Sequence, residues 1–147
     1  MENESDIDKT FAISAFNDCW KLIDKSEQSD LEKEEMVRLA EVSYWHWNRV
    51  EDKTDQNLSI GLWQLARVYT IAYRFNQAKN YANQCIEISE RAGLNPFYLG
   101  YGYESLARAQ KGAGEDFVKA LEQATQHCND VNDDESRKML KKDLQEL

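Results

Sequence analysis

Leu65-Ala66-Arg67 recurs later in the chain as Leu106-Ala107-Arg108. Each copy is followed by an aromatic residue and then an alanine, Phe75 with Ala78 and Phe117 with Ala120. A motif repeated at a fixed period is typical of tandem helical hairpins, which build binding surfaces more often than active sites. The sequence therefore predicts architecture more directly than activity.

Apolar residues recur at spacings of three and four, a period that predicts an all-α fold. Seven helices are expected, over residues 6–25, 30–51, 56–74, 76–92, 96–112, 115–130 and 133–146. Ser29 with Glu32 predicts a capping box at the start of the second helix. Gly93 and Asn95-Pro96 predict the clearest break in the chain. No break is long enough for a linker, so residues 1–147 are expected to form one domain.

The chain carries a formal net charge of -9, which would repel phosphate groups. Neither nucleic acid nor an anionic membrane is therefore expected as a partner. No stretch approaches the roughly 18 apolar residues of a membrane span, and the acidic start is unlike a secretory signal. We expect a cytoplasmic protein. Residues 56–110 differ from the rest, because they hold five basic side chains and three acidic ones.

Three cysteines, Cys19, Cys85 and Cys128, lie far apart and have only two histidines as companions. This pattern argues against a disulfide framework and against a structural metal site, and it favours reduced, buried thiols. The sequence contains no phosphate-binding glycine loop, no nucleophile elbow and no metalloprotease motif. We therefore expect a protein that is not an enzyme and that needs no cofactor.

The two repeated segments share a pattern of large, small and aromatic residues. The first has Leu62, Leu65, Ala66, Tyr69, Phe75 and Ala78, and the second has Tyr103, Leu106, Ala107, Gln110, Phe117 and Ala120. Over residues 59–127 this pattern resembles the tetratricopeptide repeat (TPR) family, although its period is longer than the family's period of about 34 residues. The resemblance implies a TPR-like, right-handed array of about three antiparallel hairpins plus a C-terminal capping helix. The chain also resembles a group of small bacterial TPR-like proteins that have no assigned activity.

In TPR proteins the first helices of successive hairpins line a concave groove. The resemblance thus implies a noncatalytic scaffold that binds a protein or peptide segment, and it places Trp63, Arg67, Tyr101, Glu104 and Arg108 in contact with that segment. Two neighbouring guanidinium groups would hold an acidic side chain or a C-terminal carboxylate. In the alternative, both arginines pair with Glu104 and nearby acids, which ties the repeats together. The protein's own C-terminal helix could also occupy the groove.

Tyr44-Trp45-His46-Trp47 is the richest local cluster of aromatic residues. Adjacent residues of a helix point about 100° apart, so these side chains face different directions. One interpretation is a packing hub between helices. Another is an aromatic pocket of Tyr44, His46 and Trp47, which would make the protein a small-molecule sensor or an unrecognised enzyme. A third alternative is a structural subunit that forms homodimers through the aromatic N-terminal third.

Overall fold

The computed structural model describes residues 3–147, and within them it contains seven α-helices and no strand. The helices are α1 (Glu4–Ile23), α2 (Asp30–Arg49), α3 (Asp55–Ile71), α4 (Phe75–Arg91), α5 (Pro96–Gly112), α6 (Val118–Asn129) and α7 (Asp134–Gln145). All seven expected helices are present, and the all-α prediction is confirmed. Residues 1 and 2 of the expected domain lie outside the described residues. None of the seven helices is long and apolar enough to cross a membrane.

Side-chain caps explain where several helices begin. Ser29 and Glu32 form the expected capping box at α2, with bonds of 3.2 and 3.0 Å. Thr54 and Asn57 form a second capping box at α3, which sequence analysis missed because asparagine replaces the usual glutamate or glutamine. The start expected for the sixth helix was three residues too early. Asp116 accepts a hydrogen bond from the Val118 amide there, and α6 begins only at Val118.

Glycine and asparagine produce the break between α4 and α5. Gly93 has a φ of 62°, a left-handed conformation that side chains with a Cβ atom rarely adopt. Asn95 then accepts a hydrogen bond from the amide of Phe97, and Pro96 occupies the first turn of α5. Both predicted end signals are therefore confirmed.

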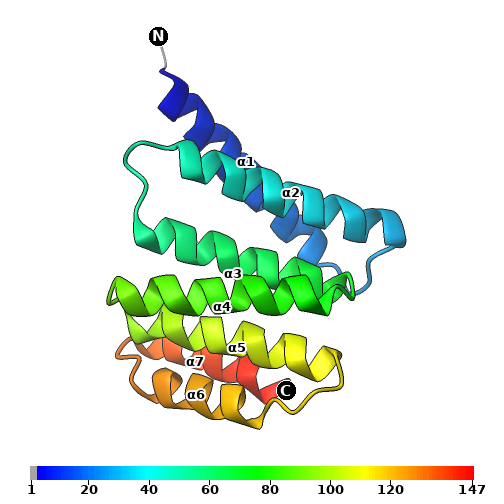
Figure 1. The fold of residues 1–147 in the computed structure, drawn as a ribbon, viewed down its shortest axis with the longest axis vertical. Helices are drawn as coiled ribbons and strands as arrows, with labels where there is room; N and C mark the ends of the chain where they lie inside the picture. The colour runs from blue at the N-terminus through cyan, green and yellow to red at the C-terminus, as the bar shows by residue number, and fades with distance from the viewer. Residues whose placement is uncertain (1–2) are drawn as a thin grey trace.

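Consecutive helices pack against each other along the whole chain, and the stack runs from α1 and α2 at one end to α6 and α7 at the other (Figure 1). Helix α3 also packs on α5, and α7 packs on both α5 and α6. The repeated alanines, Ala66 and Ala107, are fully buried, so neighbouring backbones can approach closely. This arrangement is compatible with a helical repeat.

The core divides into two hydrophobic clusters. The larger one contains residues of all five helices from α1 through α5, among them Met36, Leu65 and Val68. The smaller one joins α5, α6 and α7 around Tyr101 and Leu140. All three cysteines are buried and free, as the sequence predicts. Burial raises the pKa of the Cys19 thiol to about 12 and that of Cys85 to about 11.

Candidate binding site

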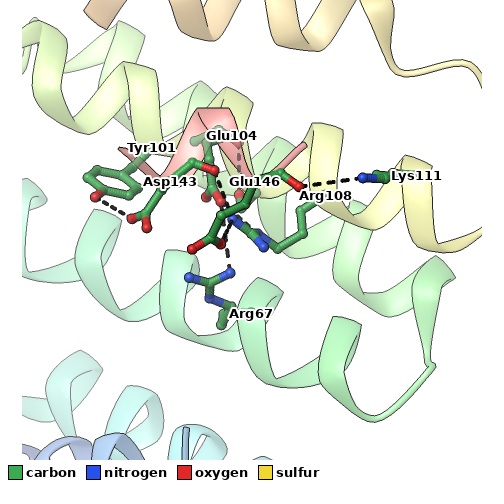
Figure 2. Close-up of polar contacts among 9 residues, drawn as sticks. Arg67, Tyr101, Glu104, Arg108, Lys111, Asp143 and Glu146 are labelled. Atoms are coloured by element: carbon green, nitrogen blue, oxygen red, sulfur yellow. Dashed lines mark hydrogen bonds and ion pairs between the residues drawn. The ribbon is translucent and has the colours of Figure 1, made fainter. Parts of the chain in front are cut away.

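The two repeated arginines converge on one buried carboxylate. Arg108 Nε donates a hydrogen bond of 2.7 Å to Glu104 Oε1, one helical turn earlier on α5. Arg67 Nη1 on α3 lies 3.9 Å from the same oxygen, and the Glu104 side chain is 1% exposed. Figure 2 shows both guanidinium groups pointing toward this carboxylate. The arginines are therefore neighbours on the same side of the molecule, and Glu104 ties α3 to α5.

Helix α7 supplies further partners for this cluster. Arg108 Nη2 donates to the Glu146 carboxylate at 3.2 Å and to the main-chain carbonyl of Asp143 at 3.3 Å. Lys111 Nζ donates to the carbonyl oxygen of Leu147 at 3.0 Å (Figure 2). The basic side chains of α5 thus bind acidic and carbonyl groups from the end of α7 and from the two residues that follow it.

Burial and charge together set the electrostatics of this cluster. Burial opposes the charge on Arg108, but the negative charges of Glu104 and Glu146 outweigh it and raise the pKa of the guanidinium group. Burial, followed by the hydrogen bond to Asp143, raises the pKa of the Tyr101 phenol. Both groups therefore keep their protons throughout the physiological pH range. The cluster is fit for binding and orientation, and neither group is prepared to act as a base.

Some buried polar atoms near the cluster lack a hydrogen-bond partner within the described residues. They are Glu104 Oε2, Arg67 Nε and Trp63 Nε1. Buried polar groups usually have a partner, and leaving one unpaired costs about 1–3 kcal/mol. These atoms are therefore places where an additional donor or acceptor would stabilise the molecule.

Arg67, Glu104 and Arg108 form an ion cluster. An aromatic cavity of about 290 Å³ lies beside this ion cluster, between α1, α3, α5 and α7. Its aromatic lining residues are Phe16, Trp20, Trp63, Phe97, Tyr98 and Tyr101. Their rings pack in sequence, with centroid distances of 5.4 Å from Trp20 to Trp63 and 5.5 Å from Trp63 to Tyr101. Neighbouring aromatic rings of the cavity wall therefore hold one another in place.

Asp143 is the one charged residue of the cavity wall among residues 3–147. Its carboxylate accepts a hydrogen bond of 2.6 Å from the hydroxyl of Tyr101. No lysine, arginine or histidine nitrogen of the described chain lies within 4.0 Å of it. The aromatic cavity thus has an acidic edge, supplied by α7.

The chain matches no protein-family model, no curated protein and no solved structure. The TPR resemblance consequently stays a prediction, and the geometry of the site is the basis for a proposed function.

The five groove residues expected from the sequence lie close together, but they belong to two different features of the site. Trp63 and Tyr101 line the aromatic cavity, whereas Arg67, Glu104 and Arg108 form the adjoining ion cluster. The alternative in which both arginines pair with Glu104 is present in the structure. Whether the five residues contact a partner stays a prediction.

Phe16, Phe97 and Asp143 also belong to this site, although the repeat pattern of the sequence does not indicate them. They lie on α1, α5 and α7, far apart in sequence, and none belongs to the duplicated pattern. The available signal for α7 was its apolar face, because Leu140 and Leu144 of that face pack against Tyr101.

The Tyr44, His46 and Trp47 side chains do not share one pocket. Tyr44 packs on the larger core cluster, and Trp47 lines a second, smaller cavity of about 180 Å³. His46 Nδ1 lies 2.7 Å from Asp8 on α1, and the His46 ring lies 5.4 Å from the ring of Phe11. No group of three metal-ligating side chains occurs in this part of the chain or elsewhere in residues 3–147. The cluster therefore joins α2 to α1 and α3, as the packing-hub interpretation expects.

Proposed function

We propose that the protein is a noncatalytic recognition module in which a TPR-like, right-handed array of hairpins binds a segment of another protein. The aromatic cavity between α1, α3, α5 and α7 is the observation that carries this proposal. A concave apolar space with few polar groups is the usual form of a site that receives a ligand or an anchoring side chain. Its position beside the first helices of the repeated hairpins agrees with the groove expected from the resemblance.

A side chain fits the size of this cavity better than a cofactor does. Sites for drug-sized ligands and cofactors typically enclose about 300–1,000 Å³, and this cavity of about 290 Å³ lies just below that range. Tryptophan and tyrosine are also the residues most enriched at the energetic centres of protein interfaces. We therefore propose that one large side chain of the partner enters the cavity, while the flanking helices contact the rest of the segment.

The sequence predicts that Arg67 and Arg108 bind an acidic group of the partner. Both arginines already face Glu104, and Arg108 also binds Glu146, the residue that follows α7. An external acidic segment would have to displace α7 to reach Arg108. We propose that the aromatic cavity is the entry point, and binding of an acidic partner at the arginines stays a prediction.

The proposal can be tested with peptides selected from a random display library. We expect the wild-type protein to select peptides whose affinity, measured by calorimetry, falls at least about tenfold in the variant Trp63→Leu. Trp45→Leu is the matched control, because Trp45 is 58% exposed and does not line the cavity. Failure to select any peptide, or equal binding by both variants, would contradict a recognition role for the cavity.

The same experiment separates the alternatives. Binding of small metabolites but not of peptides would favour a sensor. The homodimer stays a prediction, and its apolar contacts would include Phe11 and Trp45, which are 54% and 58% exposed on α1 and α2. Light scattering on the purified protein would detect such a dimer.

A further inference from the structure

The aromatic cavity combines apolar aromatic walls with the carboxylate of Asp143. One kind of side chain can bind to both. Aromatic faces attract cations, and the attraction grows when the cation is withdrawn from water. The carboxylate of Asp143 at the edge of the cavity has no cationic partner within 4.0 Å among residues 3–147. We infer that the aromatic cavity receives a lysine side chain of the partner segment, with Asp143 as the counter-charge of its ammonium group. This inference rests on the proposed function.

Lysine combines the two parts that the cavity requires. Its hydrocarbon stem can lie along apolar surface while its charged end reaches a polar group. Phe16, Trp20 and Trp63 offer that surface on α1 and α3, and Asp143 offers the acceptor on α7. The carboxylate keeps capacity for an ammonium group, because only its Oδ2 atom accepts the hydrogen bond from Tyr101.

The other ligand classes match this site less well. An acidic side chain would be repelled by Asp143, the charged group of the wall. A purely apolar side chain would bury the edge of a carboxylate without giving it a partner, which is unfavourable. Two other polar groups of the wall already have partners, since the Ser59 hydroxyl bonds to Ser89 and the Cys85 thiol to the Ser59 carbonyl.

Arg67 lies near the cavity but does not replace the proposed ligand. Its guanidinium carbon is 5.9 Å from the centre of the Trp63 ring, and Glu104 balances its charge. The indole Nε1 of Trp63 is buried without an acceptor among the described residues.

Three small peptide mimics test the inference with the wild-type protein. The probes are N-acetyl-lysine methylamide, the norleucine equivalent, which lacks the charge, and the glutamate equivalent, which reverses it. We expect the lysine probe to bind about tenfold more tightly than the norleucine probe, and the glutamate probe more weakly than both. The readout is the NMR shift of the Trp63 indole N–H, assigned with the variant Trp63→Phe. Equal binding of lysine and norleucine would overturn the inference.

Two charge-removing variants make the test specific. Asp143→Asn retains an oxygen that can accept from Tyr101, and we expect it to reduce the preference for lysine over norleucine to within about twofold. Asp52→Asn is the matched control, because Asp52 is exposed and forms no ion pair within the described chain, and it should leave the preference unchanged. Loss of the preference in both variants would indicate a general charge effect and overturn the role of Asp143.

The outcomes also separate this inference from the proposed function. If library peptides bind through Trp63 but tolerate norleucine in place of lysine, the proposed function stands and the lysine assignment falls. If tetramethylammonium binds and the lysine probe does not, the cavity receives a free cation and the lysine assignment is again overturned. If the lysine probe binds and no library peptide does, the proposed function is the part that fails.

Discussion

Tyr101 on α5 donates a 2.6 Å hydrogen bond to Asp143 on α7, at the boundary between the aromatic cavity and the ion cluster. The phenol ring also packs with Leu140 and Leu144 of α7 in the smaller core cluster. One side chain therefore holds the C-terminal helix in place and forms part of the cavity wall. The stability of α7 and the shape of the cavity are consequently linked.

Tyr101→Phe should weaken this link without emptying the core. The ring remains, but Asp143 loses its donor, and we expect the free energy of unfolding to fall by about 1.5 kcal/mol. Urea denaturation measures the change. Tyr98→Phe is the control, because Tyr98 lines the same cavity and its hydroxyl has no hydrogen bond within the described chain, and its effect should stay within about 0.5 kcal/mol. Equal losses in the two variants would argue against the Asp143 contact.

The two arginines of the repeat should differ in their importance for stability. Arg108→Met removes the 2.7 Å partner of buried Glu104 and should cost about 3–5 kcal/mol, because the carboxylate then lacks its closest counter-charge. Arg67→Met removes a longer contact of 3.9 Å and should cost less than Arg108→Met, because Glu104 keeps its partner at 2.7 Å. Chemical denaturation of both variants provides the comparison. If Arg67→Met proved the more damaging variant, the geometry of the ion cluster would be wrong.

Leu140→Ala should loosen α7 from the rest of the protein. Leu140 is fully buried in the smaller core cluster, and truncating such a side chain typically costs about 2–5 kcal/mol. Met139 is its neighbour on the same helix but is 57% exposed, so Met139→Ala should change stability by less than about 0.5 kcal/mol. Hydrogen exchange of α7 amides would show faster opening only in the first variant. Unchanged exchange there would mean that Leu140 does not anchor the helix.

Asp8 should make stability depend on pH in the acidic range. The hydrogen bond with His46, followed by the charge and hydrogen bond of Arg49, lowers the pKa of this carboxyl below its ordinary value of 3.8, against the effect of burial. Because the pKa is lower in the folded state, the contribution is complete above the unfolded-state value and is lost as the pH falls through the folded-state value.

The variant Asp8→Asn provides the measurement for this prediction. It should be less stable than wild type at pH 7, and the difference should shrink as the pH falls below 3.8 toward the folded-state pKa. Asp52→Asn serves again as an exposed control and should show no such convergence. A constant difference between Asp8→Asn and wild type from pH 7 down to pH 2 would argue against the contribution of Asp8.

The sequence predicts the helices well because their determinants are local. Ser29 with Glu32, and Gly93 followed by Asn95, act within a few residues of the positions that they cap. The duplicated tripeptides also indicate that two helices present equivalent side chains. Arg67 and Arg108 accordingly lie on the same side of the stack, close to a shared carboxylate.

The site is harder to predict because it depends on contacts between distant segments. Asp143 belongs to a helix that is not part of the duplicated pattern, and its value to the cavity appears only when α7 packs on α5. The sequence left open whether α7 folds back, since its apolar face could cover several neighbours. The pairing of His46 with Asp8 is another long-range contact, and no local spacing indicates it.

When the repeated tripeptides are aligned, Trp63 and Glu104 occupy matching places, two residues before the leucine of each copy. One copy therefore contributes an indole to the aromatic cavity, and the other contributes the buried anion that both arginines face. Exchanging the two hairpins would put a carboxylate among aromatic rings and an indole among guanidinium groups. The order of the two repeated hairpins along the chain therefore determines where the aromatic cavity and the ion cluster form. A protein with the two hairpins exchanged would have neither in its present form.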